Sequence, residues 1–429
     1  MHEEEVVIGD DSDLGSDLDD DDIPDSDDDC LHPPSDSDNE SVSLATEASV
    51  SSDDSDVDFE KINRMPDDDS DVEPPVEPLE SNIRDEVAEP LRLALPLRDG
   101  TTPDIGWEPD EMAAFLMFNP PHMLLCILAA MHSLGCYGVD RYLDSVEFFS
   151  GHAAVTRAWA AAGLKSLDYD ILNDSKYQNL NSNWGFIHAL QSMRRLRPRR
   201  GVCWLGTVCS TWVFMSRNST MRTHLNPQGD ISRTCVRNGN RQASRSALLI
   251  AICYSRLLGY VLEQPGSSMI WRHPSMVHAQ ATAVKLGARW HRVSLYMWHY
   301  ASDHLKRTEL LSNESWTHSL SNDHPGSKGR KAKGPRTADT YTRADGKKMC
   351  TGTKDLKSTQ TYTKEFGQAV SLSFLTERTF FDDVNCTRGQ LDLGDINISD
   401  QDDPWQDSEL NGVADAFLHY HSLTKKPSR

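Results

Sequence analysis

The stretch that decides the fold is DSVEFFSGHAAVTRAWAAAGLKSLDYDI, residues 144–171. It opens with the apolar run VEFFSG, which ends in a glycine turn as a short buried strand does. The segment HAAVTRAWAAAG follows with a helical pattern, and Gly163 predicts its C-terminal cap. A second apolar run, LKSLDYDI, comes directly after it. A strand, a helix and a second strand at this spacing are typical of a βαβ unit with parallel strands.

The same alternation continues to about residue 313. Strand-like runs recur as GVCWL (201–205), YVLEQPG (260–266), RVSLYMWHY (292–300) and TELLSN (308–313). Helical segments lie between them, at WGFIHALQSMRRLRP (184–198), which Pro198 stops, and at RQASRSALLIAICYSRLL (241–258), which Gly259 closes. The fold class that we predict is α/β, with a Rossmann-like, mostly parallel sheet and helices on both of its faces.

The charge of the chain is very unevenly distributed. The formal net charge is −23, but residues 1–90 hold 34 acidic against 3 basic residues. Residues 141–376 hold 33 basic against 15 acidic residues. An acidic segment with so few apolar residues cannot bury enough surface to offset its ordering entropy. We therefore predict that residues 1–100 are a disordered acidic tail, and that the body of the protein is basic.

The remaining boundaries follow from composition. We predict that residues 101–143 form a helical segment that precedes the main domain, and that residues 144–376 form the main domain itself. A basic, glycine-rich stretch near 314–360 indicates a surface insertion in that domain, and residues 377–429 return to an acidic tail with a short helix near its end.

Several classes of protein are disfavoured by the sequence. The N-terminus MHEEEVVIGDD lacks the basic and then apolar order of a signal peptide. The longest apolar run, residues 123–131, is roughly half of what a membrane helix needs. The nine cysteines include no CxxC pair and the histidines no HExxH spacing. We expect an intracellular protein from a reducing compartment, with no membrane association and no metal.

In an open parallel sheet, ligands bind at the carboxyl ends of the strands. Phe149 and Gly151 lie at the first such end, where a glycine turn lets the backbone approach a ligand. Asp168 and Asp170 end the second strand, where a carboxylate can accept hydrogen bonds from ribose hydroxyls. A plain tight turn explains the same residues equally well, because no complete GxGxxG is present.

Two further strand ends carry reactive side chains. Cys209, in WLGTVCS, is a candidate nucleophile if its surroundings lower the pKa of its thiol; otherwise it is an inert small apolar residue. Glu263, in VLEQPG, follows an apolar strand, where a carboxylate needs a partner or a function. The alternative for Glu263 is a hydrogen bond to a neighbouring backbone amide.

The interval from Ser175 to Leu262 holds thirteen lysines and arginines against one acid, Asp230. Aromatic residues lie among these cations, which together suit phosphates and unstacked bases. This favours a nucleic acid as partner, whereas a solvated face, or a face that binds the acidic tail, is the alternative.

Taken in order, these motifs resemble those of the DNA cytosine-5 methyltransferase family, which has the class I S-adenosylmethionine-dependent methyltransferase fold. EFFSG resembles the cofactor-binding motif, GTVCST the nucleophile loop and LEQP the strand end that follows it. LKRTELL and EFGQAVSLSF occupy the places of two later motifs. The chain differs at four positions, where Val208, Ser210, Gln264 and Gln368 stand for the family's proline, glutamine and two asparagines.

The resemblance implies a function and a set of roles. S-adenosylmethionine would bind at Phe149 and Gly151, with its ribose on Asp168 or Asp170. Cys209 would attack carbon 6 of a flipped cytosine, and Glu263 would hydrogen-bond its ring nitrogen 3 and amino group. The candidates for contacts with nucleic acid, DNA rather than RNA, are Arg217, Arg222, Lys306 and Arg307. A nuclear location fits these roles.

Two alternatives to methyl transfer stay open at this point. One is a methyltransferase fold with a lost or altered reaction that only binds nucleic acid. The other is an interaction protein that acts through its acidic tail, for which a basic protein would be the partner.

Overall fold

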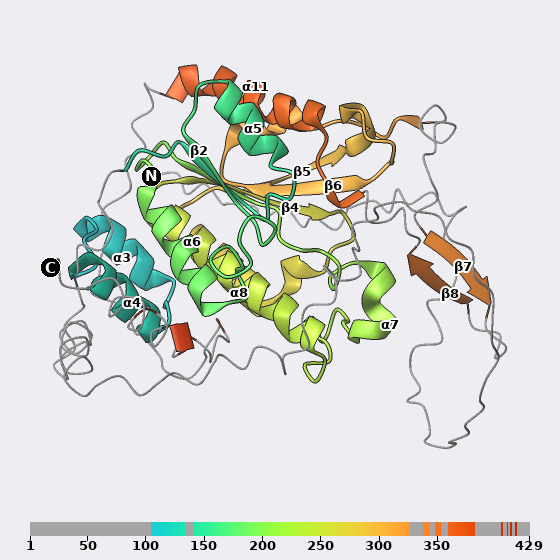
Figure 1. Ribbon diagram of the computed structural model, residues 1–429, viewed down its shortest axis with the longest axis horizontal. Coiled ribbons are helices and arrows are strands. Elements are labelled where there is room, and N and C mark those ends of the chain that lie inside the picture. Colours follow the sequence, from blue (N-terminus) through green and yellow to red (C-terminus); the bar gives the residue numbers. More distant parts are fainter. Residues whose placement is uncertain are drawn as a thin grey trace, which may run out of the picture. The chain divides into compact units, whose positions relative to one another are not determined.

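The computed structural model describes residues 104–133, 141–326, 338–342, 348–352 and 359–381, together with Trp405, Leu410, Gly412, Val413 and Phe417. The predicted acidic tail of residues 1–100 and most of the predicted C-terminal tail lie outside the described residues. The described part is built around one six-stranded sheet (Figure 1).

The sheet has the strand order β2-β1-β3-β4-β6-β5. Its strands are β1 (Ser145–Phe148), β2 (Ser166–Tyr169), β3 (Val202–Leu205), β4 (Gly259–Pro265), β5 (His291–Tyr296) and β6 (Arg307–Ser312). The pairs β1–β2, β1–β3 and β3–β4 are parallel, whereas β6 runs antiparallel to both β4 and β5. The predicted α/β class with a mostly parallel sheet is thus confirmed, with one reversed strand that we did not predict.

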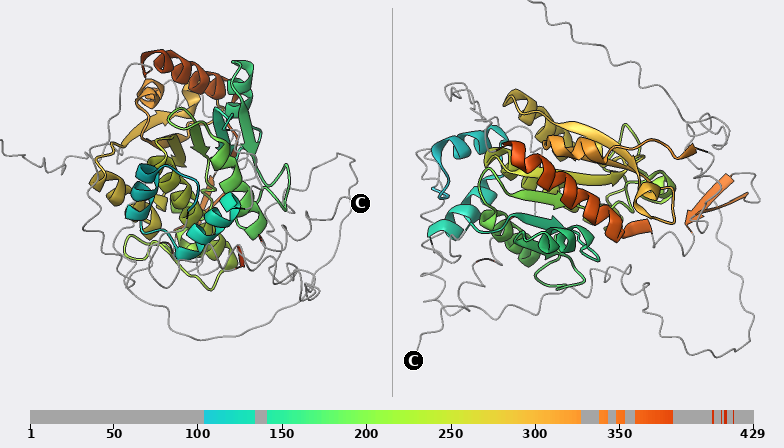
Figure 2. Two further views of the ribbon diagram at one scale, coloured as in Figure 1. Left: turned by 90° about the vertical axis from the view of Figure 1, so that its left-hand side faces the viewer. Right: turned by 90° about the horizontal axis from the view of Figure 1, so that it is seen from above.

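Helices cover both faces of this sheet. On one face lie α5 (Ala154–Ala161), α11 (Lys364–Phe381) and the 3-10 helix η4 (Ser315–Leu320). On the other face lie α3 (Pro109–Met117), α4 (His122–Ser133), α6 (Asn183–Arg195), α8 (Thr234–Ser255) and α9 (Pro274–Lys285). In the right-hand view of Figure 2, α11, coloured red, lies over this face of the sheet.

Short elements complete the described residues. Four short helices lie in loops. They are the 3-10 helices η1 (Phe214–Ser216), η2 (Ile270–Arg272) and η3 (Met297–Tyr300) and the single-turn helix α7 (Arg217–Thr220). The strands β7 (Ala338–Thr342) and β8 (Lys348–Gly352) pair as a separate antiparallel ribbon. The segment 314–360, which we predicted to be a surface insertion, therefore contains η4 and this ribbon.

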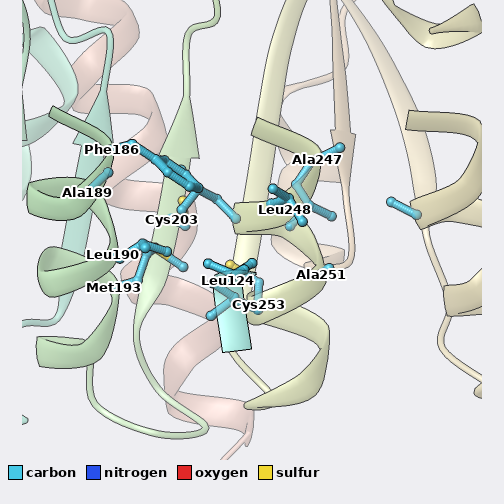
Figure 3. Close-up of a cluster of buried hydrophobic side chains, with 14 of the residues drawn as sticks. Leu124, Phe186, Ala189, Leu190, Met193, Cys203, Ala247, Leu248, Ala251 and Cys253 are labelled. Atoms are coloured by element: carbon cyan, nitrogen blue, oxygen red, sulfur yellow. The ribbon is translucent and has the colours of Figure 1, made fainter. Parts of the chain in front are cut away.

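Each central strand is buried on both faces because its side chains alternate between two cores. In β3, Cys203 and Leu205 join the core under α6 and α8, whereas Val202 and Trp204 join the core under α5 and α11. Figure 3 shows Cys203 between Phe186 of α6 and Leu248 of α8, in the larger of these cores.

The larger core also takes in residues from the C-terminal end of the chain, where we had predicted an acidic tail. Trp405, Leu410, Val413 and Phe417 are all buried in it. The Trp405 indole Nε1–H donates to the carbonyl oxygen of Asn119 at 2.6 Å, and its ring meets His278 edge to face. This part of the C-terminal segment therefore contributes to the core.

Candidate functional site

The turn after β1 is held in an unusual backbone conformation. Phe149 and Ala153 have φ of 58° and 53°, in the left-handed region that favours glycine, and Gly151 has φ of 53°. Left-handed non-glycine residues cost about 1–3 kcal/mol each and concentrate at ligand sites. A β-carbon added to Gly151 would meet no heavy atom within 4 Å, and the buried Ser150 hydroxyl has no partner in the described residues. The turn is thus a strained, open cradle that leads into α5.

Asp168 and Asp170, the two carboxylates that we predicted to bind a ribose, have different hydrogen-bond partners. The Asp170 carboxylate accepts hydrogen bonds from the backbone N–H groups of Gly151 (2.8 Å) and Leu172 (2.9 Å), so it holds the turn in place. Asp168 lies within β2, half-buried, and accepts a hydrogen bond from the Asn173 side chain at 2.7 Å. Asp168 is therefore better placed than Asp170 to receive hydroxyl groups of a ligand.

Glu147 is a residue of this site that the sequence analysis missed. It lies in β1 opposite Asp168 and is fully buried. Its Oε2 accepts hydrogen bonds from the backbone N–H and the hydroxyl of Thr156, both at 2.6 Å, whereas its Oε1 has no partner in the described residues. Burial raises the pKa of Glu147 to about 7; the Thr156 hydrogen bonds oppose this and the Asp168 charge adds to it. The feature of the sequence that could have identified Glu147 is the presence of a glutamate inside the apolar run VEFF.

A second cluster of ionisable side chains forms where β3, β4 and β6 meet. Glu263 lies in β4, and its Oε1 is 3.3 Å from the ammonium of Lys306, just before β6. Its Oε2 accepts a hydrogen bond from the Tyr362 hydroxyl at 3.0 Å. Cys209 is half-buried in the loop after β3, close enough that the charges of Lys306 and Glu263 both affect its thiol. The structure thus brings Cys209, Glu263 and Lys306 together and adds Tyr362.

Burial and the two neighbouring charges have opposing effects on the pKa of Cys209. Burial raises the pKa of Cys209, the charge of Lys306 lowers it, and that of Glu263 raises it. Burial works against the ammonium of Lys306, but Glu263 and Cys209 together raise its pKa. In this arrangement Cys209 is mainly a thiol at neutral pH, and Lys306 is the group that stabilises its thiolate.

The two halves of the site share one edge of the sheet. A β-carbon added to Gly206, at the end of β3, would lie 2.9 Å from the Tyr362 hydroxyl and 3.3 Å from the carbonyl oxygen of Phe149. Gly206 therefore permits the close approach of the turn after β1 and the Glu263 cluster.

Gln264 connects the cysteine loop to β4. Its Nε2 donates to the carbonyl oxygen of Thr207 at 2.5 Å, and its Oε1 accepts from the Ser268 hydroxyl at 2.8 Å. This fixes the loop two residues before Cys209, while Val208 and Ser210 on either side of the cysteine are exposed.

The predicted nucleic-acid contacts separate into two groups. Arg217 stacks its guanidinium 4.9 Å from the centroid of the Phe214 ring, which is 56% exposed. Arg307 is half-exposed and 3.6 Å from Glu309. Both can reach a ligand from solvent. Lys306 instead pairs with Glu263 inside the site.

Arg222 departs from the expectation, because it is buried. Its guanidinium lies 3.4 Å from the centroid of the Trp212 ring and donates to the carbonyl oxygen of Pro227 and to the Asn240 side chain. Arg245 and Arg256 are buried in the same way, with backbone carbonyls as acceptors. Three of the thirteen cations in the basic interval therefore support the interior, and Trp204 and Trp212 are buried as well.

Comparison with family models, with curated proteins and with solved structures gave no match. None of the described helices is long and apolar enough to span a membrane. Within the described ranges, no group of three or more histidine, cysteine or acidic side chains could hold a metal ion.

Proposed function

We propose that the chain transfers a methyl group from S-adenosylmethionine to carbon 5 of cytosine in nucleic acid, with Cys209 as the nucleophile. The observation that carries this proposal is the meeting of Cys209, Glu263 and Lys306 at the carboxyl edge of the sheet, next to the open turn at Gly151. The sheet is compatible with it too, because the parallel strands β1, β3 and β4 end at one edge, which is where ligands of open α/β sheets bind.

The turn after β1 fits the cofactor. Gly151 leaves free space where a ligand would approach the backbone, and Ser150 offers a buried hydroxyl without a partner in the described residues. Asp168 would receive the ribose hydroxyls, while Asp170 keeps the turn in shape. When bound, S-adenosylmethionine would supply an electrophilic methyl group.

The remaining residues would act on the base. The Cys209 thiol must lose its proton, and the ammonium of Lys306 would stabilise the resulting thiolate. The thiolate sulfur would form a bond to carbon 6, which makes carbon 5 nucleophilic. Ring nitrogen 3 would take up the proton that the thiol loses as the ring loses its aromaticity, and Glu263 would accept hydrogen bonds from nitrogen 3 and from the amino group. Carbon 5 would then take the methyl group, which leaves S-adenosylhomocysteine, and loss of the carbon-5 proton to solvent with expulsion of the Cys209 sulfur would restore the ring.

The surface beside Cys209 fits an unpaired base. Exposed apolar side chains flank it in the sequence, with Val208 before it and Phe214, Met221, Leu225 and Ile231 after it. Arg217 lies over the Phe214 ring, so that a cation and an aromatic face are presented together. Such pairs stack on bases and neutralise phosphates with little sequence preference.

Binding without methyl transfer is the second candidate function. It is favoured by the raised pKa of Cys209, since a protonated thiol is a poor nucleophile. A single experiment separates the two candidates, because DNA with 5-fluorocytosine blocks the final elimination and leaves a covalent protein–DNA adduct after methyl transfer.

We expect an adduct with wild-type protein, DNA and S-adenosylmethionine, and none with Cys209→Ser, because a hydroxyl is far less ionised at neutral pH. Cys235→Ser is the matched control, since Cys235 is exposed and lies at the start of α8, outside the cluster. Glu263→Gln should slow the adduct without removing the nucleophile. Absence of the adduct despite measured cofactor and DNA binding would favour the second candidate, and an adduct that persists in Cys209→Ser would assign another cysteine.

A further inference from the structure

Tyr362 connects helix α11 to the candidate site. It lies two residues before α11, and its hydroxyl donates to Glu263 Oε2 at 3.0 Å. The same hydroxyl accepts a hydrogen bond from the Trp204 indole Nε1–H, at 3.4 Å. Trp204 belongs to β3 and is fully buried. The three side chains therefore form a relay of hydrogen bonds from the core of the sheet to the Glu263 carboxylate.

The Tyr362 ring is fixed on several sides. It packs edge to face on Trp204, with centroids 6.1 Å apart, and lies 5.1 Å from the Phe366 ring of α11. The adjacent Thr363 hydroxyl donates to the carbonyl oxygen of Tyr300 at 2.5 Å and accepts from the Phe366 backbone N–H at 3.2 Å. The start of α11 is thus locked, which leaves the Tyr362 hydroxyl little freedom.

The two oxygens of Glu263 have different partners. Lys306 lies at Oε1 with a full charge, and Tyr362 donates to Oε2. Burial and the neighbouring carboxylates raise the pKa of Tyr362, so its hydroxyl remains a donor throughout the neutral range. A carboxylate held at both oxygens cannot rotate, yet each oxygen keeps a lone pair for a further donor.

We propose that Tyr362 is a positioning residue that fixes the plane of the Glu263 carboxylate toward the base, and that Trp204 orients Tyr362 for this purpose. The inference rests on the proposed function and adds a residue 99 positions away in the chain from Glu263. Without the hydroxyl, Lys306 would be the one partner of the carboxylate left among the described residues, and the side chain could turn about that contact.

The test compares two tyrosines that share a neighbour. Tyr362→Phe removes the hydroxyl at Glu263. Tyr300→Phe is the matched control, because Tyr300 also packs on Phe366, at 5.2 Å, but donates to the carbonyl oxygen of Leu320. Both variants remove one hydrogen bond from the same aromatic cluster, so their thermal transitions report any general loss of packing.

We expect Tyr362→Phe to lower kcat for methyl transfer about tenfold, as for loss of a hydrogen bond to a charged group, with KM for DNA unchanged. Tyr300→Phe should leave kcat unchanged. In a Glu263→Gln background the further effect of Tyr362→Phe should vanish, because the two residues act as one unit. Trp204→Phe, which keeps the ring packing but removes the indole N–H, should produce a smaller loss of kcat.

Each result has a distinct meaning. An active wild type whose kcat is unaffected by Tyr362→Phe would overturn the positioning role and leave the proposed function intact. The same holds if the effects of Tyr362→Phe and Glu263→Gln simply multiply, or if Tyr300→Phe lowers kcat equally. A wild type that binds cofactor and DNA but transfers no methyl group would overturn the proposed function, and the positioning role with it.

Discussion

Glu147 provides a test of the structure that does not depend on any activity. The change is Glu147→Gln. The amide oxygen can still accept the two hydrogen bonds from Thr156, while the ionisable group is removed. The comparison therefore isolates the free energy of placing a carboxylate at this buried position of β1.

The magnitude follows from the pKa shift. Burial raises the pKa of Glu147 from 4.5 to about 7, and one unit corresponds to about 1.4 kcal/mol, so the ionised carboxylate costs the folded state on the order of 3 kcal/mol. Below pH 4.5 both states are protonated and no cost arises. As the pH rises toward 7, the unfolded state loses its proton first, so the free energy of unfolding falls with pH. Above the folded-state pKa the cost is complete.

The assay is urea unfolding of both proteins between pH 4 and 8. Relative to the wild type, Glu147→Gln should gain up to about 3 kcal/mol of stability across this range, most of it between pH 4.5 and 7. Asp168→Asn serves as a second variant. Removal of the like charge should lower the pKa of Glu147, and so narrow the pH range over which the free energy of unfolding changes. A stability difference that does not change with pH would refute the burial of an ionisable Glu147.

Three further predictions follow from other parts of the chain. Gly151→Val should abolish S-adenosylmethionine binding in calorimetry, whereas Gly163→Val, at an equally open position with positive φ, should share its stability cost but keep binding; equal affinities in the two would contradict a cradle at Gly151. Trp405→Ala should lower the free energy of unfolding by about 3–5 kcal/mol in chemical denaturation, because a buried, hydrogen-bonded indole is lost from the core. A chain that starts at residue 101 should keep the thermal transition and bind DNA more tightly at low salt, with affinity falling steeply as salt rises, because 34 acidic residues among the first 90 are gone; equal affinities of the two chains at low salt would argue against competition by the tail.

The layers of the fold could be predicted because periodicity and glycine punctuation agree in the βαβ unit at residues 144–171. Strand direction was less accessible, since an apolar run has the same pattern in either direction. The connection lengths did hold a signal for β6. A parallel crossover needs a dozen or more residues, and ten separate the end of β5 at Tyr296 from the start of β6 at Arg307. The short connection therefore favours an antiparallel pairing of β5 and β6.

The predictable part of the site consists of residues next to strand ends. Cys209 and Glu263 could be identified there because a polar side chain directly beside an apolar strand stands out in the sequence. Tyr362 could not be, because its contact with Glu263 depends on how α11 packs across the sheet. Arg222 was wrongly predicted to contact nucleic acid for a related reason. A count of charges treats every arginine as exposed, whereas Arg222 is buried, with its guanidinium on the Trp212 ring and hydrogen-bonded to a backbone carbonyl.

The buried charges of the protein fall into two kinds, and the distinction bears on where the function lies. Arg222 and Arg256 donate to backbone carbonyls or a side-chain amide, so they stabilise loops and helix ends, and burial is the main cause of the lowered pKa of each. At the carboxyl edge, by contrast, Glu263 faces Lys306 and Tyr362, Lys306 acts on Cys209, and Glu147 faces Asp168. There the charges of Lys306, Glu263 and Asp168 shift the pKa values of Cys209, Lys306, Tyr362 and Glu147. Ionisable groups with shifted pKa values concentrate at functional sites. The coupling at this edge, more than the presence of one cysteine, favours it as the place of chemistry.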